Sequence, residues 1–178
     1  MILLLHGAAF SSQTWVDKVD TLVTLAALGN RVIAIDLPGY GKTRQRVSEK
    51  GKYLSSVISE LSPDQAPVVV SPSMSGSFVV PLLRQSAAQV SGWVPVAPVS
   101  TRDGRDFFPG LHVPTMILYG QLDTSLGLSS AKDLQLIPTS TEPQVLPGAK
   151  HPAYLDQPQL WHQLLYNFIS ALWTLTEL

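Results

Sequence analysis

Three residues of this chain could together perform acyl transfer: Ser73, Asp123 and His151, in that order along the sequence. A serine hydroxyl is a poor nucleophile at neutral pH, so it needs a base such as histidine within hydrogen-bond reach. The histidine in turn needs a carboxylate that fixes its tautomer and stabilises its charged form. The types and order of these residues therefore favour nucleophilic catalysis by a serine.

The stretch around Ser73 carries the most specific signal. Residues 68–70 form an apolar, β-branched run that predicts a buried strand, and an amphipathic segment follows the serine. Serine nucleophiles at such strand-to-helix turns have the pattern G-x-S-x-G, because a large side chain two positions away would collide with the strained turn. Here Ser71 and Ser75 replace both glycines. The alternative interpretation is that Ser71 or Ser73 caps the following helix.

Strands and helices alternate along the chain. Short apolar runs predict six strands, and segments with apolar residues at helical spacing predict the helices between them. This alternation is typical of a mostly parallel sheet with helices on both faces, so we expect one α/β domain over residues 1–178. The expected strands are 2–5, 31–36, 68–71, 93–96, 115–119 and 144–146, and the expected helices are 15–28, 53–61, 75–89, 126–136 and 159–172.

The predicted sheet also brings the candidate residues together. In parallel sheets functional residues lie at the carboxyl ends of the strands. Ser73, Asp123 and His151 each follow a predicted strand, so we expect their side chains at one edge of the sheet. Phe107 and Phe108 either line an acyl pocket there or pack in a satellite core.

Composition argues against several other functions. The chain has 178 residues, 45% of them hydrophobic, and a net charge of −1, which gives no sign of a nucleic-acid or membrane surface. It has no cysteine, and its four histidines lack metal-ligand spacing, so we expect neither a metal nor a cofactor. Without a signal segment or an 18-residue apolar run, we expect an intracellular protein. We further expect it to be a cytoplasmic, and also nuclear, monomer. Gly41-Lys42-Thr43 could end a phosphate loop, but Asp36 occupies a position where that motif needs glycine.

Over essentially its whole length the chain resembles the α/β-hydrolases. The stretches that carry this likeness are His6-Gly7, Asp36-Leu37-Pro38-Gly39-Tyr40-Gly41, the turn at Ser73, Tyr119-Gly120-Gln121-Leu122-Asp123 and Gly148-Ala149-Lys150-His151-Pro152. Three stretches together are similar to the abhydrolase domain-containing fourteen subgroup, also called CIB-type hydrolases. They are Ser71-Pro72-Ser73-Met74-Ser75-Gly76, Val94-Pro95-Val96-Ala97-Pro98 and His151-Pro152-Ala153-Tyr154-Leu155-Asp156.

The resemblance implies a role for each candidate residue. It implies Ser73 as nucleophile, His151 as base and Asp123 as acid. Some family members place the acid after the preceding strand, where this chain has Asp103, although Asp123 stands in the better sequence context.

The same resemblance implies an oxyanion hole, and the chain departs from many of the family in having no room for a lid. The backbone N–H groups of Ala8 and Met74 would bind the oxyanion, and His6 would hold the turn that carries Ala8. Many relatives carry a lid domain between the fourth and fifth strands. Residues 97–114 are too few to build one, so we expect an open site.

The usual fold has strands before the one that ends at His6, and this sequence begins on that strand. We therefore expect an amino-terminally shortened sheet, in which residues 32–35 form an apolar edge without proline or lysine. Because such an edge favours aggregation, we expect these 178 residues to be less soluble and less stable than a version extended by two strands.

Together, the residues and the resemblance predict a serine hydrolase that acts on small acyl esters, thioesters or amides. Its partners would be small acyl substrates or acylated side chains. A first alternative is an acyltransferase or protein-lysine deacetylase that passes an acetyl group to coenzyme A. A second is a non-catalytic adaptor with a hydrolase fold, bound to a protein in a transcription complex; an intact set of three catalytic residues argues against it.

Overall fold

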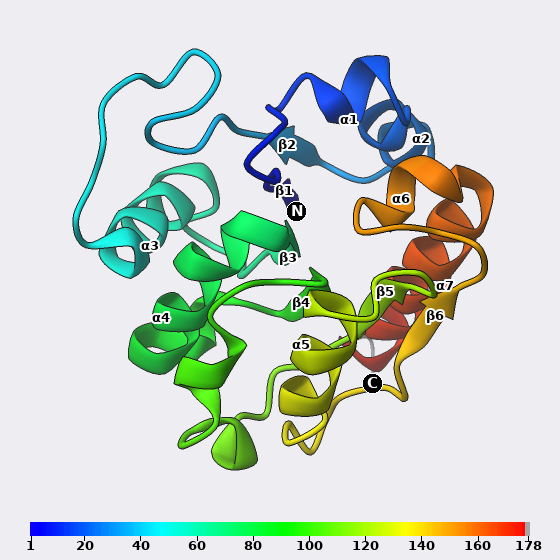
Figure 1. Ribbon diagram of the computed structural model, residues 1–178. Helices are drawn as coiled ribbons and strands as arrows, with labels where there is room; N and C mark the ends of the chain where they lie inside the picture. The colour runs from blue at the N-terminus through cyan, green and yellow to red at the C-terminus, as the bar shows by residue number, and fades with distance from the viewer. Residues whose placement is uncertain (177–178) are drawn as a thin grey trace.

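A single parallel sheet of six short strands runs through the centre of the molecule (Figure 1). The computed structural model describes residues 1–176. The strands are β1 (Ile2–Leu4), β2 (Val32–Ala34), β3 (Val68–Pro72), β4 (Gly92–Val96), β5 (Leu118–Gly120) and β6 (Gln144–Leu146), in the spatial order β2-β1-β3-β4-β5-β6. The chain runs outward from β1 to β2 and then returns to β3 on the other side of β1. Ligands bind at such a reversal of strand order in open α/β sheets.

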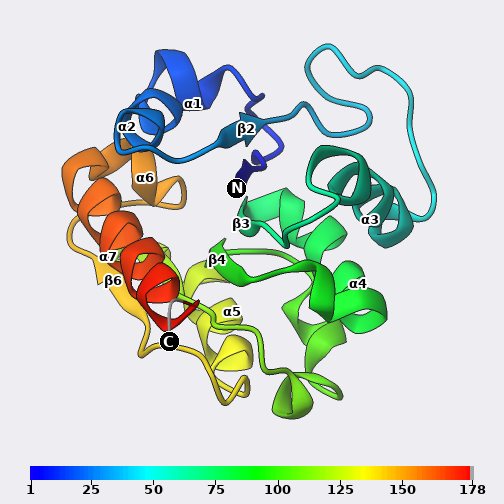
Figure 2. The same cartoon turned by 180° about the vertical axis from the view of Figure 1, so that it is seen from behind.

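Helices cover both faces of this sheet (Figure 2). One face carries α1 (Thr14–Asp17), α2 (Thr21–Ala27), α6 (Ala153–Asp156) and α7 (Pro158–Thr176). The other carries α3 (Lys50–Leu61), α4 (Gly76–Ser86) and α5 (Leu126–Leu134). The predicted α/β class, a mostly parallel sheet with helices on both faces, is thus confirmed. No helix within residues 1–176 is both long and apolar enough to cross a membrane.

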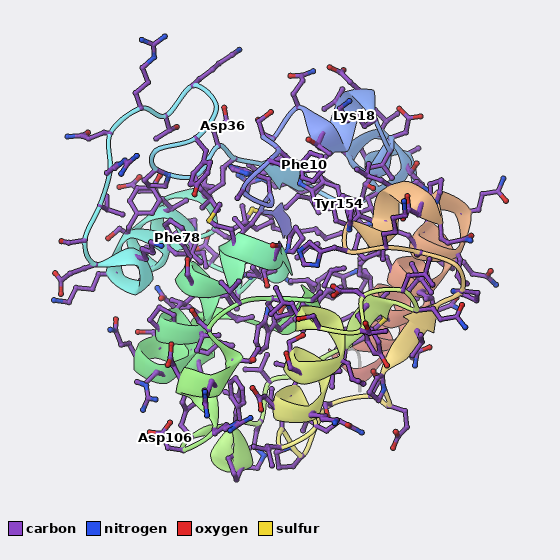
Figure 3. The ribbon with its side chains drawn as sticks, in the orientation of Figure 1. Phe10, Lys18, Asp36, Phe78, Asp106 and Tyr154 are labelled. Atoms are coloured by element: carbon purple, nitrogen blue, oxygen red, sulfur yellow. The ribbon has the colours of Figure 1, made fainter. Side chains whose placement is uncertain are left out.

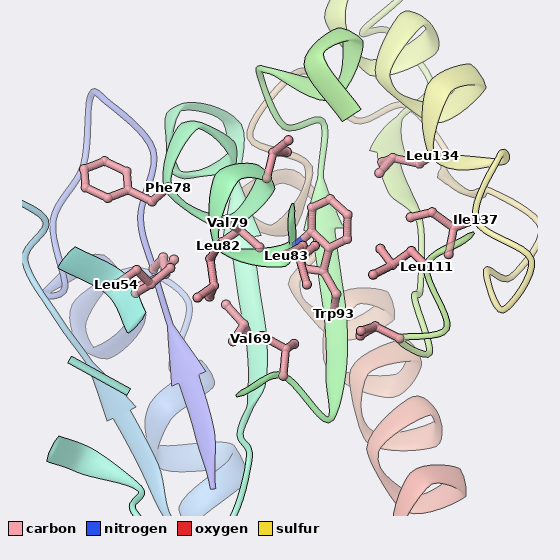
Figure 4. Close-up of a cluster of buried hydrophobic side chains, with 14 of the residues drawn as sticks. Leu54, Val69, Phe78, Val79, Leu82, Leu83, Trp93, Leu111, Leu134 and Ile137 are labelled. Carbon is pink, nitrogen blue, oxygen red and sulfur yellow. The ribbon is translucent and has the colours of Figure 1, made fainter. Parts of the chain in front are cut away.

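Strands β1 to β5 contribute to two separate hydrophobic cores, because successive side chains of a strand point to opposite faces. The edge strand β6 contributes only Leu146, to one of them. Val69 of β3 packs with Leu54, Phe78, Trp93 and other side chains beneath α3, α4 and α5 (Figure 4). Its neighbours on either side face the opposite core, beneath α1, α2, α6 and α7. The two cores together hold the sheet in place, and with it the strand ends that carry the candidate site.

The prediction of one continuous helix over residues 15–28 is wrong. Helix α1 ends at Asp17 and α2 begins at Thr21. Between them Asp20 adopts a φ of 53°, in the left-handed region, which no residue within an α-helix can have. The hydrophobic spacing was correct, since Trp15 and Leu25 are both buried in the same core.

Other boundaries differ less. The predicted helix 75–89 divides into a short 3₁₀ turn, η1 (Ser73–Ser75), then α4, which contains Pro81, and a second 3₁₀ turn, η2 (Ala87–Gln89). The predicted strand 115–119 is regular only as β5, while Thr115 makes isolated bridges to Trp93 and Ser140.

The link from β4 to β5 contains only two 3₁₀ turns, η3 (Thr101–Gly104) and η4 (Phe108–Gly110). No lid domain therefore stands between these strands, as the sequence predicted. At the other side of the sheet, β2 pairs only with β1 among the described residues, so it lies at an edge. Its residues are half-buried. The lower solubility and stability expected from this edge stay a prediction.

Candidate active site

Ser73 sits on a sharp turn between β3 and α4. Its φ is 50°, in the left-handed region that side chains other than glycine rarely adopt. A neighbouring loop stabilises this strained backbone conformation, because the carbonyl of Ser73 accepts a hydrogen bond from the N–H of Val99 at 2.9 Å. This is the conformation expected of a nucleophile elbow, in which the serine side chain projects from a strand-to-helix turn.

The two serines that replace the elbow glycines are completely buried and hydrogen-bonded. Ser71 Oγ accepts a hydrogen bond from Trp93 Nε1 at 2.7 Å, and Ser75 Oγ donates one to the carbonyl of Pro72 at 2.7 Å. Neither Ser71 nor Ser73 caps a helix: the cap positions before η1 and α4 are Pro72 and Ser75, without side-chain cap bonds. The alternative interpretation of these serines as helix caps is therefore wrong.

The three predicted residues meet in one chain of hydrogen bonds. His151 Nε2 lies 2.8 Å from Ser73 Oγ, and His151 Nδ1 lies 2.5 Å from Asp123 Oδ2. An ionised carboxylate can only accept, so Nδ1 carries the proton and Nε2 is free to accept the serine proton. The side chain of Asp123 is 7% exposed and that of His151 is 40% exposed. The carboxylate is thus shielded from water, while the His151 ring can be reached from outside.

The loops that carry Asp123 and His151 are bonded directly to each other. The N–H of Leu122 donates to the carbonyl of Ala149 at 2.8 Å. Gly120 makes this approach possible, because a Cβ at this position would overlap the carbonyl of Ala149. The glycine in the Gly-Gln-Leu-Asp stretch is therefore a steric requirement of the site.

The alternative acid, Asp103, lies on η3 and is exposed. Its backbone carbonyl accepts a hydrogen bond from Arg84 Nη2 at 2.5 Å, and no bond joins its side chain to His151 within residues 1–176. The carboxylate that reaches His151 belongs to Asp123.

Two backbone N–H groups next to Ser73 have no acceptor. Ala8 lies in the turn after β1 and lines the same cavity as Ser73, and Met74 follows Ser73 in the first turn of η1, where helical N–H groups lack internal acceptors. Among the described residues, neither group donates a hydrogen bond to the protein. Both are therefore available to a substrate oxygen.

His6 holds the turn that carries Ala8. It is fully buried; its Nε2 accepts the N–H of Leu37 at 3.0 Å, so its Nδ1 is the protonated nitrogen and donates to the carbonyl of Gly7 at 2.9 Å. Burial lowers the pKa of His6 below its ordinary value, which keeps the ring neutral. A neutral, fully bonded ring fits a positioning residue and not a second base.

The carboxylate of Asp36 bonds to the segment Gly41-Lys42-Thr43, which resembles the end of a phosphate loop. Its carboxylate accepts the N–H of Lys42 at 2.7 Å and that of Ser12 at 2.8 Å. Desolvation opposes its charged form, but the bonds from Lys42 and Ser12 outweigh it and hold the pKa of Asp36 below its usual range. The backbone donor that would face a phosphate is thus bonded to a carboxylate of the protein.

A cavity of about 200 Å³ opens beside Ser73. Its wall is mostly apolar and is formed by Gly7, Ala8, Ala9, Phe10, Pro72, Ser73, Val96, His151, Pro152 and Tyr154. Phe10 and Tyr154 lie close together between the loop after β1 and α6 (Figure 3), with their ring centroids 6.4 Å apart.

Phe107 and Phe108, considered from the sequence as an acyl pocket, do not line this cavity. Phe108 is fully buried in the core with Trp93, and Phe107 packs under the guanidinium of Arg84. The sequence reasoning missed Phe10 and Tyr154 as wall residues. The one signal it had was their position, since Phe10 closely follows His6-Gly7 and Tyr154 lies within the stretch that begins at His151.

The chain is similar to known proteins over most of its length. A family model described as "Alpha/beta hydrolase family" matches residues 2–118. "Protein ABHD14A" of Danio rerio is 42% identical over 176 residues, covering 96% of this chain and 64% of its own length. "Putative protein-lysine deacylase ABHD14B" of Homo sapiens is 38% identical over 181 residues, covering 96% of this chain and 83% of its own length. The chain thus spans less than two thirds of the Danio rerio protein.

Solved structures share the fold at lower identity. The "predicted CIB-like hydrolase" from Thermoplasma acidophilum has a TM-score of 0.84 at 22% identity, over 94% of this chain and 84% of its own. A thermophilic esterase from Thermogutta terrifontis has a TM-score of 0.81 at 17% identity, over 96% and 89%. At these identities the likeness concerns the fold alone.

Proposed function

Because this chain belongs to the alpha/beta hydrolase family, and within it to the ABHD14 subgroup, we propose that it is a serine hydrolase acting on small acyl esters, thioesters or amides. The observation that carries the proposal is the hydrogen-bonded chain from Ser73 through His151 to Asp123, at 2.8 and 2.5 Å. A serine on a strained turn, bonded to a histidine that a buried carboxylate orients, is the arrangement that activates a hydroxyl for attack.

In the first step Ser73 Oγ attacks the acyl carbon while its proton passes to His151 Nε2. The carbonyl oxygen becomes an oxyanion, which the N–H groups of Ala8 and Met74 stabilise. Asp123 stabilises the imidazolium that forms. When the oxyanion collapses, the bond to the leaving group breaks, and His151 gives its proton to that group. An acyl-serine remains.

In the second step water replaces the leaving group. His151 takes a proton from the water as its oxygen attacks the acyl carbon, and a second oxyanion forms at the same N–H groups. Collapse breaks the bond to Ser73 Oγ, which recovers its proton from His151. The products are the free acid and the unchanged protein.

The dimensions of the site favour a short acyl chain. The cavity of about 200 Å³ is smaller than the roughly 300–1,000 Å³ of sites for drug-sized ligands. The entrance lacks a lid, since β4 and β5 are linked only by η3 and η4 and the loops around them. A small acyl group displayed on a larger molecule could therefore reach Ser73.

One relative points to a more specific substrate. The human protein that is 38% identical over most of its length carries the name "Putative protein-lysine deacylase ABHD14B". An acylated lysine presents a short acyl group at the end of a long, thin side chain, which an open site with a small cavity would accommodate. We therefore include an acyl-lysine amide among the substrates to be tested.

Labelling with a fluorophosphonate probe tests the proposal without knowledge of the natural substrate. We expect the wild-type chain to be labelled and to hydrolyse short p-nitrophenyl esters, and Ser73→Ala to lose both. Loss of a triad serine lowers kcat by about 10⁶ in related chemistry. Ser71→Ala and Ser75→Ala are matched controls that should still be labelled. Labelling that survives in Ser73→Ala would refute the assignment, and an unlabelled wild-type chain would favour the non-catalytic adaptor.

A further inference from the structure

Tyr154 has an unusual position beside the reactive residues. It lies on α6, three residues after His151, and is 2% exposed. Its ring packs among other aromatic rings, with centroid distances of 4.8 Å to Trp15, 6.0 Å to Trp161 and 6.4 Å to Phe10. It also forms part of the wall of the cavity that contains Ser73. The ring is thus fixed firmly at the edge of the site.

The hydroxyl group of Tyr154 has no hydrogen-bond partner among the described residues. Buried tyrosine hydroxyls usually find one. In the described part of the chain, only Ser91 Oγ is a fully enclosed side-chain polar atom without a partner. The Tyr154 oxygen is therefore not fully enclosed, and its residue lines the cavity beside Ser73.

The other polar side chains of the cavity wall are already paired. Ser73 and His151 are bonded to each other, and they and Tyr154 are the only wall residues with polar side chains. Around the aromatic cluster, Trp15 Nε1 donates to the carbonyl of Leu5 and Trp161 Nε1 donates to Thr21. Burial raises the pKa of Tyr154, so its hydroxyl keeps its proton at neutral pH. Among the described residues that form this mostly apolar wall, the Tyr154 hydroxyl is thus the one side-chain donor without a partner.

We infer that Tyr154 is a specificity-determining residue: its hydroxyl donates a hydrogen bond to an oxygen carried by the acyl chain of the substrate. The inference rests on the proposed function of the site. A hydrocarbon acyl chain would leave the hydroxyl unpaired in an apolar cavity, whereas an acyl chain with a suitably placed ether or carbonyl oxygen would pair both groups. The site should therefore prefer oxygen-bearing acyl chains over alkanoyl chains of the same size.

Isosteric ester pairs test this preference. The first pair is p-nitrophenyl butanoate and p-nitrophenyl methoxyacetate, in which an oxygen replaces the third carbon of the acyl chain. The second pair is p-nitrophenyl pentanoate and p-nitrophenyl 3-methoxypropanoate, in which an oxygen replaces the fourth carbon. The ratio of kcat/KM within a pair is measured for the wild type and for Tyr154→Phe. Dividing the two ratios cancels the intrinsic reactivity of the esters. We expect Tyr154→Phe to lower the oxygen-to-methylene ratio roughly 3- to 10-fold for at least one pair.

Tyr166→Phe is the matched control, because Tyr166 is 48% exposed on α7 and outside the cavity wall. It should leave both ratios unchanged. Equal ratios in the wild type and Tyr154→Phe, for both pairs, would overturn the inference. Since the hydroxyl has no protein partner, its removal breaks no internal bond and the variant should fold.

A binding measurement separates failure of this inference from failure of the proposed function. If the wild type hydrolyses none of the esters, the proposed function fails. The inference is then decided by NMR titration of Ser73→Ala with butanamide and methoxyacetamide, with and without Tyr154→Phe. Preference for methoxyacetamide that disappears in Tyr154→Phe would support it. Equal affinity for both amides, an undiminished preference, or no binding of either would overturn it.

Discussion

Restoring glycine to the elbow should destabilise this protein. In the pattern G-x-S-x-G the position two residues before the nucleophile is glycine, but here it is Ser71. Ser71 Oγ is the acceptor for Trp93 Nε1 at 2.7 Å, and both residues are completely buried. Ser71→Ala and Ser71→Gly each remove that acceptor and leave the buried Trp93 Nε1–H without a hydrogen-bond partner.

The expected cost follows from that enclosure. A buried N–H group that loses its partner costs about 1–3 kcal/mol. We expect Ser71→Ala to lower the free energy of unfolding by about 2 kcal/mol, which lowers the melting temperature of a chain of this size by about 4–8 °C. Ser71→Gly should cost about 0.5–1 kcal/mol more, because glycine in a strand loses more backbone entropy on folding. Labelling of Ser73 should persist in both variants.

A double-mutant cycle isolates the hydrogen bond. Ser71→Ala, Trp93→Phe and the double variant are unfolded in urea, and their free energies of unfolding are compared with that of the wild type. Trp93→Phe removes the donor, so Ser71→Ala should cost about 1–2 kcal/mol less in that background. Ser75→Ala is the control, because the Ser75 hydroxyl bonds to Pro72 and should show no coupling to Trp93→Phe.

Two results would refute this reasoning. The first is additivity of Ser71→Ala and Trp93→Phe within about 0.5 kcal/mol, which would mean that the bond contributes nothing of its own. The second is a Ser71→Gly variant as stable as the wild type. In that case only the small size of residue 71 would matter, and glycine at this position would not lower the free energy of unfolding.

Two further predictions concern the acid of the site and acid stability. Asp123→Asn should lower kcat by roughly 10⁴ with little change in KM, because His151 would be held in the wrong tautomer. Asp103→Asn should leave kcat nearly unchanged. If steady-state kinetics showed the large loss of kcat in Asp103→Asn instead, the acid would be Asp103 on η3. Because burial places the pKa of His6, and likewise that of His162, below 6.5 in the folded state, the unfolded state binds more protons below that pH. The free energy of unfolding should therefore fall as pH decreases from about 6.5 to about 5, and urea unfolding that is independent of pH over this range would contradict the prediction.

The positions of Ser73, Asp123 and His151 could be predicted from the sequence because they depend on sheet topology alone. Each residue follows a short apolar run, and parallel strands bring their carboxyl ends to one edge. Chain order and strand order then suffice to place the three side chains near one another. Their catalytic roles stay a prediction, which the labelling and kinetic experiments address.

The cavity beside Ser73 could not be predicted in this way. Its wall joins Phe10, after the first strand, to Tyr154, on a four-residue helix near the other end of the chain. Contacts between segments so distant in sequence leave no periodicity in either segment. For Phe107 and Phe108 the sequence left an acyl pocket and a satellite core equally open, because an adjacent aromatic pair gives no local sign of whether it faces a site or a core. The break between α1 and α2 at Asp20, whose φ is in the left-handed region, could not be predicted either, because the apolar spacing around it is regularly helical.

The elbow of this protein shows which part of the G-x-S-x-G pattern is physically necessary. Ser75 occupies the second glycine position, and its hydroxyl finds an acceptor in Pro72, so a small polar side chain is tolerated there. The neighbouring Gly76 has no such freedom: a Cβ would lie 2.7 Å from a side-chain carbon of Pro98 and would also overlap the carbonyl of Val99. In this elbow the strict requirement for glycine thus lies at Gly76, where α4 meets the loop after β4. The turn of this chain is therefore marked by a strand, a serine in the left-handed conformation and a close helix contact, and not by glycines two residues to either side of that serine.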